Sequence, residues 1–250
     1  YLQLYNELSF FNPLKYLFFF EQIILKKYEK KIASLFDHIV LVSKEDPKSF
    51  QVTNKIKNKI KIIPLGIDLK KKSFTFKQKN KDIIFIGNIN YLPNRIACFD
   101  FIEKIMPKLR KEGLNVNLKI IGKTSKLLKF RLNNFNNVQV YNNIKSPERL
   151  CNNAICGIAN LSIVTGMQFK ILEYMRMGLP SIISKKCFDS LNLKKDHDLL
   201  VYRNDDEFVK QIIKLKTKKN FANKISRNCY RKIKTNYTWE KSLKKYNNLI

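Results

Sequence analysis

One short segment of the sequence, TGMQFKILEYMRMGLP at residues 165–180, combines residue types that could bind a charged ligand. Thr165, followed three positions later by Gln168, has the spacing of a capping box, which predicts a helix that begins at Gly166. The free N–H groups and the positive dipole end of such a helix attract phosphate. A glycine there also lets a ligand approach the backbone closely. The segment therefore predicts a phosphate site at the start of a helix.

Two charged side chains follow on one face of that predicted helix. A single stripe with the spacing i, i+3, i+4 and i+7 is formed by Gly166, Phe169, Lys170 and Glu173. Lys170 can place a point charge beside a phosphate. Glu173, one turn deeper, can accept hydrogen bonds from two hydroxyl groups. A phosphate followed by a diol describes the diphosphate and ribose of a nucleotide. An ordinary ion pair between Lys170 and Glu173 explains the spacing equally well, so the spacing alone leaves both interpretations open.

Short apolar segments alternate with helical patterns through the rest of the chain. The segments predicted as strands are 38–43, 59–65, 82–87, 117–122, 138–141, 154–161, 181–184 and 199–202. A helix is predicted over 95–113, where apolar residues keep the 3.6-residue period and Gly113 provides the C-terminal cap. This alternation indicates an α/β fold with a Rossmann-like parallel sheet covered on both faces. The polar, lysine-rich stretch 68–81 has no periodicity and is expected to link two such domains.

The predicted sheet also locates the chemistry, because ligands of open parallel sheets bind outside the carboxyl ends of the strands. Gly87 and Asn88 end the first strand after the linker. Their turn, the turn at 122–123 and the turn at 165–166 are expected to project into one crevice. None of these turns is a G-x-G-x-x-G or P-loop motif, so the motifs favour neither NAD binding nor ATP hydrolysis.

Composition limits the class of partner. The chain has 250 residues, 44% of them hydrophobic, which is enough for one large or two modest domains. Its formal net charge of +29 favours polyanions such as an anionic membrane surface or phosphorylated ligands. The basic residues are scattered, without a nucleic-acid-binding motif, so nucleic acid is not expected as a partner. A compositional bias toward Lys, Asn and Ile, with lysines on solvated faces, explains the charge without any partner.

The five cysteines and the longest apolar run bear on location. The cysteines have no C-x-x-C spacing and are expected to be reduced thiols of a cytoplasmic protein. No apolar run approaches the ~18 residues that a membrane-spanning helix requires. The closest run, 13–25, is interrupted by polar residues and predicts a buried amphipathic helix. Its aromatic residues lie beside Lys26 and Lys27, so a helix at the inner face of an anionic membrane is the alternative.

The segment GMQFKILEYMRMGLPSI resembles the donor-site signature of the family-4 glycosyltransferases of the GT-B fold, G-x-x-x-K-x-L-E-x-M-x-x-G-x-P. Segments 28–46, 59–68, 83–94 and 236–243 are also similar to parts of that family. The resemblance implies four regions. They are the end of an acceptor-side N-terminal domain (1–67), a linker (68–81), a nucleotide-sugar (donor) domain (82–235) and a helix that crosses back to the N-terminal domain (236–250).

The resemblance also implies an activity. A sugar would move from a nucleoside-diphosphate sugar to a glycan or lipid-linked acceptor, with retention of anomeric configuration, in cell-surface polysaccharide synthesis. No cofactor and no essential metal are expected. Lys170 and Glu173 would be the catalytic residues, with Glu173 on the donor ribose and Lys170 beside the leaving diphosphate. The remaining donor-binding residues would be Gly87, Asn88, Thr165, Gly166, Met167, Gln168 and Phe169.

The sequence departs from the family pattern in three ways. Thr165 occupies the position of the first glutamate of the E-x7-E motif. The Arg and Lys that many relatives place after the first donor strand are replaced by Asn88 and, approximately, Asn94, so Lys170 is expected to supply the missing cation. The chain starts without Met and with only the end of the N-terminal domain, so it is expected to be a fragment. A nucleotide-sugar epimerase of the same fold and a non-catalytic basic binding module remain alternatives.

Overall fold

The computed structural model describes residues 12–43, 46–49, 54–69, 73–142, 144, 146–164, 166–247 and 249. Its main part is a six-stranded sheet in the order β5-β4-β3-β6-β7-β8, and all its neighbouring strands are parallel. These strands are β3 (Asp82–Ile86), β4 (Asn117–Ile121), β5 (Val138–Tyr141), β6 (Ala154–Ala159), β7 (Ser181–Ser184) and β8 (Leu200–Tyr202). A smaller parallel sheet pairs β1 (Ile39–Leu41) with β2 (Ile60–Ile62). The predicted α/β fold class is confirmed.

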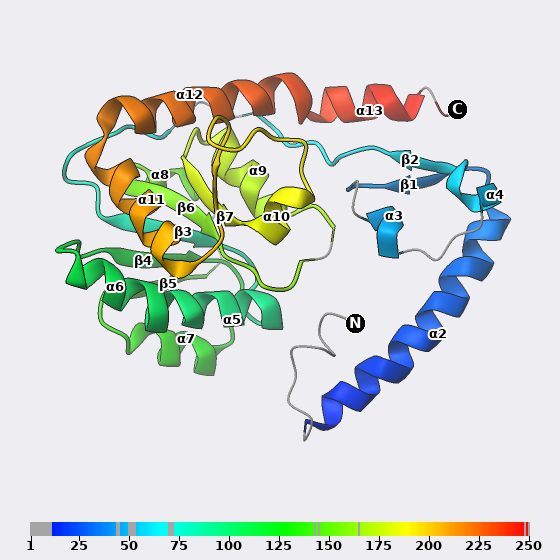
Figure 1. Cartoon of the computed structure of the whole chain (residues 1–250), viewed down its shortest axis with the longest axis horizontal. Coiled ribbons are helices and arrows are strands. Elements are labelled where there is room, and N and C mark those ends of the chain that lie inside the picture. Colours follow the sequence, from blue (N-terminus) through cyan, green and yellow to red (C-terminus); the bar gives the residue numbers. More distant parts are fainter. Residues whose placement is uncertain are drawn as a thin grey trace.

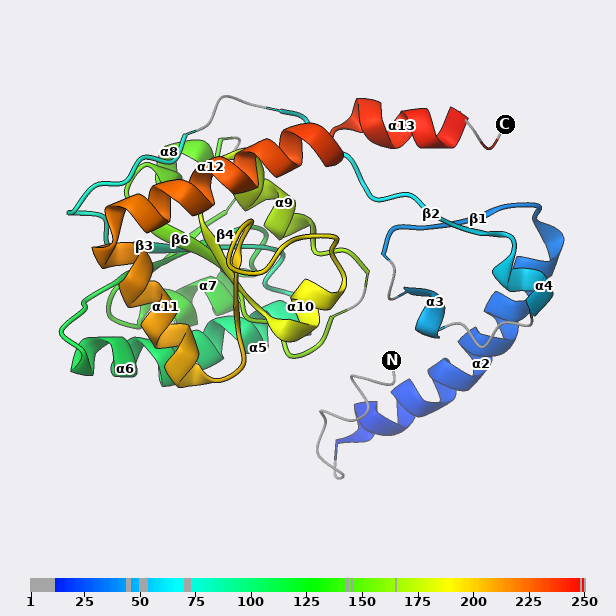
Figure 2. The ribbon, with the colours of Figure 1, turned by 45° about the horizontal axis from the view of Figure 1, so that its top comes forward.

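Helices connect the strands and cover the large sheet on both faces (Figure 1). The helices before β3 are α2 (Pro13–Leu35), α3 (Asp46–Ser49) and α4 (Asn54–Lys57). The later ones are α5 (Leu92–Asp100), η1 (Phe101–Ile105), α6 (Met106–Lys111), α7 (Lys126–Asn133), α8 (Glu148–Cys151), α9 (Phe169–Arg176), α10 (Lys185–Asp189), α11 (Asp205–Thr217), α12 (Lys219–Asn236) and α13 (Trp239–Asn247). Figures 1 and 2 show α5, α6 and α11 on one face and α8, α9 and α12 on the other.

The core follows from the alternation of side chains along the strands. Ile83 and Phe85 of β3 belong to one apolar cluster, whereas Ile84 between them belongs to a second cluster on the opposite face. Every residue of β6 is buried, as expected for a central strand of a parallel sheet that helices cover on both sides. Each fully buried Ile or Phe side chain stabilises the fold by roughly 1.5–3 kcal/mol relative to an exposed one.

The helix predicted over 95–113 is interrupted by a π-helical turn. Helix α5 passes into η1, where the N–H of Met106 donates to the carbonyl of Phe101, five residues earlier. Pro107 then occupies the second position of α6. Proline has no backbone N–H, so in an uninterrupted α-helix one hydrogen bond would be lost at this position. The proline ring would also clash with the carbonyl four residues earlier. The wider turn accommodates the proline, and Gly113 ends the segment with φ of 76°.

The segment predicted as a linker packs against the large sheet where it is described. Phe74 is buried in the second apolar cluster. The N–H groups of Ser73 and Phe74 both donate to the carbonyl of Met177, at 3.1 and 3.0 Å. At the other end of the same segment, the ammonium group of Lys216 donates to the carbonyl of Asn80 at 2.5 Å. Phe76, partly buried, packs against both apolar clusters, so this polar stretch is attached to the sheet by two aromatic side chains.

Helix α13 contacts the segment that follows β2. The hydroxyl of Ser242 donates to the carbonyl of Pro64 at 2.8 Å. A Cβ atom on Gly66 would lie 2.5 Å from the backbone of Trp239, so this close approach requires glycine. Figure 2 shows α12 leading into α13, which extends beyond the large sheet toward the side of β2. The contact joins the end of the chain to the small sheet.

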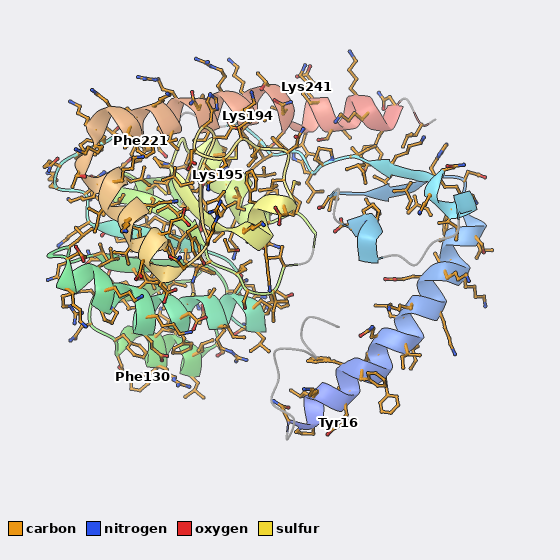
Figure 3. The ribbon with its side chains drawn as sticks, viewed as in Figure 1. Tyr16, Phe130, Lys194, Lys195, Phe221 and Lys241 are labelled. Atoms are coloured by element: carbon orange, nitrogen blue, oxygen red, sulfur yellow. The ribbon has the colours of Figure 1, made fainter. Side chains whose placement is uncertain are left out.

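Helix α2 differs from the prediction of a buried helix. Only Ala33 is buried among its residues, and Leu17, Phe20 and Ile24 are 52%, 61% and 66% exposed. Figure 3 shows Tyr16 near the start of this helix, away from the large sheet. None of the helices in the described ranges has the length and apolarity that crossing a membrane requires. The apolar residues of 13–25 thus form an exposed surface.

Candidate functional site

Lys170 is the buried centre of the candidate site. It is the second residue of α9 and only 7% exposed. Its Nζ donates to Oδ1 of Asn94 at 2.6 Å and lies 4.1 Å from the ring centroid of Phe85. In the described part of the chain, no carboxylate forms an ion pair with Lys170. An amide oxygen and an aromatic face stabilise this buried charge less than a carboxylate would.

Burial sets the protonation state of this lysine. It lowers the pKa of Lys170 to about 8, because removal from water disfavours the ammonium form. The thiols of Cys98 and Cys187 face the same group. Burial raises the pKa of Cys98 to about 12 and also raises the pKa of Cys187, so both thiols stay neutral at pH 7. Lys170 is therefore charged at neutral pH, whereas the groups around it are neutral. An anionic ligand would supply the missing counter-charge.

Glu173 is paired with Arg176 and not with Lys170. Oε2 of Glu173 accepts from Nε and from Nη2 of Arg176, both at 2.7 Å. Nη1 of Arg176 contacts Oε1 of Glu148, on α8, at 2.8 Å. Arg176 is 6% exposed, so these charge-assisted contacts are shielded from solvent. Of the two explanations that the spacing left open, the Lys170–Glu173 ion pair is wrong.

Arg176 was not among the site residues predicted from the sequence. Its i,i+3 spacing from Glu173 was readable and predicts an ion pair. Its second partner, Glu148, could not be found in this way, because it lies 28 residues away. The arginine occupies one oxygen of Glu173 and leaves Oε1 as the oxygen that could accept from a ligand hydroxyl.

Helix α9 begins three residues later than predicted. Its first residue is Phe169, and Gln168 is the N-cap residue with an extended backbone. Gly166 has φ of 61°, a left-handed conformation that favours glycine and cannot continue a right-handed helix. The predicted start at Gly166 is therefore wrong, and the stripe on the helix is reduced to Phe169, Lys170 and Glu173. Thr165, and with it the predicted capping box, lies outside the described residues.

The turn after β3 is linked to Lys170 through the side chain of Asn94. Nδ2 of Asn94 donates to the backbone carbonyl of Asn88 at 2.9 Å. A Cβ atom on Gly87 would lie 2.9 Å from that Nδ2, so the glycine makes room for the amide. Gly122, at the end of β4, packs so tightly that its own Cβ would lie 2.0 Å from the carbonyl oxygen of Gly87. The structure thus brings the ends of β3 and β4 and the first turn of α9 together.

Met167 lies on a different side of its loop. It borders a cavity of about 130 Å³ between the small sheet and the large one. That cavity does not reach Lys170 or Glu173. It is lined by Val42, Ile62, Pro64, Met167, Ser190, Leu191, Asn192, Asn236, Tyr237 and Lys245. Met167 therefore lines the space between the two sheets, and the neighbouring Gly166 also faces Val42, since a Cβ there would lie 3.8 Å from it.

The fold, a Rossmann-like parallel sheet covered by helices, is that of GT-B glycosyltransferase domains. The chain belongs to the family described as glycosyl transferases group 1, whose family model matches residues 80–218. The match extends from β3 to α11 and includes Lys170 and Glu173. No curated protein shows a significant match to the chain.

Solved structures of low sequence identity share the fold. TarM of S. aureus has a TM-score of 0.71 at 15% identity, over 90% of this chain and 45% of TarM. HepE of Anabaena, solved with UDP and glucose, has a TM-score of 0.71 at 12% identity, over 90% of this chain and 66% of HepE. The pneumococcal O-GlcNAc transferase GtfA, solved with UDP and GlcNAc, has a TM-score of 0.66 at 15% identity, over 89% and 46%. The chain spans about half the length of TarM and GtfA.

Proposed function

We propose that the chain forms the donor-binding part of a family-4 glycosyltransferase. The enzyme would transfer a hexose from a nucleoside-diphosphate sugar to a glycan or lipid-linked acceptor, with retention of anomeric configuration. The observation that carries this proposal is the buried Lys170, which lies among neutral groups beside the turn after β3 in a chain of the glycosyl transferases group 1. The UDP bound in HepE and GtfA makes UDP-sugars the first donors to test.

The diphosphate would lie between the first turn of α9 and the turn at Gly87 and Asn88. When the bond between the sugar and the diphosphate breaks, negative charge develops on the leaving phosphate. The ammonium group of Lys170 and the positive end of α9 would stabilise that charge without reorganising. No essential metal and no further cofactor are part of this proposal.

The ribose would be bound by Glu173. Arg176 fixes the carboxylate through Oε2, so the side chain does not lose further rotamer freedom when a hydroxyl binds to Oε1. Gly166, Gln168 and Phe169 would provide backbone groups beside the distal phosphate, with Thr165 preceding them. This order, phosphate first and ribose one helical turn deeper, matches the order of groups along a nucleoside diphosphate.

A membrane-peripheral location on the cytoplasmic side, in cell-surface polysaccharide synthesis, belongs to the same proposal. A net charge of +29 and the exposed apolar residues of α2 support attraction to an anionic bilayer. A lipid-linked acceptor would be found at that surface. The acceptor itself would bind on the side of the small sheet.

The direct test is a thermal-shift panel with UDP-, GDP-, ADP- and TDP-sugars. A donor at 100 times its Kd should stabilise the protein by roughly 2.7 kcal/mol, which raises Tm by several degrees. One base should act much more strongly than the others. If no nucleotide sugar raises Tm, the proposed donor site is contradicted. Once an acceptor is found, NMR of the anomeric proton of the product tests retention.

A further inference from the structure

Three groups from three elements form a continuous hydrogen-bonded chain beneath the candidate donor site. Nζ of Lys170, on α9, donates to Oδ1 of Asn94, on α5, at 2.6 Å. Nδ2 of Asn94 then donates to the backbone carbonyl of Asn88, in the turn after β3, at 2.9 Å. Lys170 and Asn94 are each 7% exposed. These two hydrogen bonds therefore connect a buried cation with the backbone of the turn through one neutral side chain.

Lys170 and the backbone carbonyl of Asn88 together fix which way the amide points. An ammonium group can only donate, so the oxygen of Asn94 must face Lys170 and the nitrogen must face Asn88. The absence of a side chain at Gly87 leaves room for that nitrogen, since a Cβ there would lie 2.9 Å from it. A neutral amine could still donate to Oδ1, and the Asn88 carbonyl would still require an N–H, so loss of the proton weakens the contact between Lys170 and Asn94 without turning the amide.

We infer that Asn94 is a positioning residue of the donor site: protonated Lys170 holds its amide through a charge-assisted hydrogen bond, and the amide holds the turn at Asn88 in place for the diphosphate. The inference rests on the proposed donor-binding function and identifies the residue through which the buried charge acts on the turn. Asn94 does not touch the ligand in this account. Its loss should impair binding of the diphosphate while leaving recognition of the nucleoside intact.

This coupling makes diphosphate binding depend on pH. The titratable groups that face Lys170 are the thiols of Cys98 on α5 and Cys187 on α10, and burial raises the pKa of both. Because burial lowers the pKa of Lys170 to about 8, the lysine loses its proton as pH rises through that value while the thiols keep theirs. The second pKa of a phosphate is about 6, and the uracil N3–H stays protonated up to about pH 8.5, so the ligand charge changes little between about pH 7 and that limit. Affinity for UDP should fall above pH 8, and affinity for uridine should not.

The experiment measures UDP and uridine binding between about pH 7 and about pH 8.5, where the ligand charge changes little, for the full chain and for Asn94→Asp. The aspartate keeps an acceptor for Lys170 but places oxygen instead of N–H against the Asn88 carbonyl. We expect UDP affinity at pH 7 to fall about tenfold or more, with uridine affinity unchanged. The new carboxylate should also raise the pKa of Lys170 and move the remaining pH dependence of UDP binding upward.

Two further variants separate positioning from other effects. Asn94→Ser removes the amide without adding charge, so a selective loss of UDP affinity there cannot come from neutralising Lys170. Asn80→Asp is the matched control. Asn80 is 2% exposed and donates to the carbonyls of Thr75 and Ala154, at the amino ends of β3 and β6 and thus away from the candidate site. This control should lower Tm and leave the ratio of UDP to uridine affinity unchanged.

The outcomes distinguish the inference from the proposed function. If the unmodified chain binds no nucleoside diphosphate, the proposed function fails. If it binds UDP, but Asn94→Asp and Asn94→Ser show the same UDP-to-uridine ratio and the same pH profile as the unmodified chain, the positioning role is wrong and the donor site stands. If Asn94→Asp does not fold, Asn94→Ser alone is held to the same expectation.

Discussion

Glu173 and Arg176 determine how the proposed site could recognise a nucleoside. Arg176 is held by two carboxylates, Glu173 on its own helix and Glu148 on α8, and all three side chains are mostly shielded from solvent. A buried arginine with two carboxylates fixes both of them, since each contact is directional and charge-assisted. Glu173 is therefore an oriented acceptor whose free oxygen can select for vicinal hydroxyls. In the proposed function, Lys170 on the same helix would bind the phosphate.

Replacement of Glu173 by glutamine tests this division of roles. Glu173→Gln keeps the shape of the side chain and removes its charge, and Arg176 keeps its contact with Glu148. UDP and uridine should lose affinity equally, because they share the ribose. A hydrogen bond to a charged group contributes ~1.5–3 kcal/mol, so we expect roughly tenfold to over a hundredfold. Unchanged affinity for both ligands in calorimetry would show that Glu173 does not bind ribose.

At the scale of elements, Tyr174 joins α9 to two strands. Its hydroxyl donates to the carbonyl of Ile158 in β6 and accepts from the N–H of Ile86 in β3, both at 2.9 Å. The ring packs where a Cβ on Gly157 would come within 2.5 Å, so β6 needs glycine at this point. Burial raises the pKa of Tyr174 well above its usual range, which keeps the donating proton in place. The Tyr174 hydroxyl thus links the ends of β3 and β6 in place of a direct hydrogen bond between their backbones.

We expect Tyr174→Phe to destabilise the protein. The change leaves two buried backbone groups without this partner, at a cost of ~1–3 kcal/mol each at most. Chemical denaturation should show a lower midpoint with an unchanged slope. Tyr91→Phe is the matched control, since Tyr91 is exposed and should be nearly neutral. Equal midpoints for the two variants would contradict the bridging role of Tyr174.

The elements also show how far the sequence alone leads. The short apolar segments predicted all eight strands that the described residues form, because a buried strand needs only a short local run of suitable residues. The helix start at Gly166 was mispredicted because the capping pattern is local, whereas the structure gives this glycine a left-handed backbone. The contact between Lys170 and Asn94 spans 76 residues, so no spacing rule could find it. Contacts between elements require the fold.

At the scale of the whole molecule, charge and exposed apolar surface are distributed over distant elements. Helix α12 contains no acidic residue, and its exposed positions include Lys224, Arg227, Arg231 and Lys234. Figure 3 shows Lys241 on α13, next along the same edge, and Lys194 and Lys195 in the region beside α12. The exposed apolar side chains of α2 lie on a separate part of the molecule. Both features suit contact with an anionic bilayer, one through charge and the other through burial of apolar area.

The protein should therefore co-sediment with anionic vesicles and be released by salt, because surface attraction is screened over ~10 Å at 0.1 M ionic strength. Phe20→Ser together with Ile24→Ser should reduce the fraction that stays bound at high salt. These two are the most exposed large apolar side chains in the run 13–25. Neutral vesicles are the control. Equal recovery with neutral and anionic vesicles, or none with either, would mean that the lysines only solvate the surface.

Calorimetry of Lys170→Ala with UDP and uridine at pH 7 shows whether Lys170 provides the charge for a diphosphate in this site. If the panel selects another base, the corresponding diphosphate and nucleoside replace them. We predict that UDP affinity falls roughly tenfold to over a hundredfold, as for loss of a charge-assisted contact of ~1.5–3 kcal/mol, while uridine affinity is unchanged. Parallel losses for UDP and uridine, or unchanged UDP binding, would contradict the account.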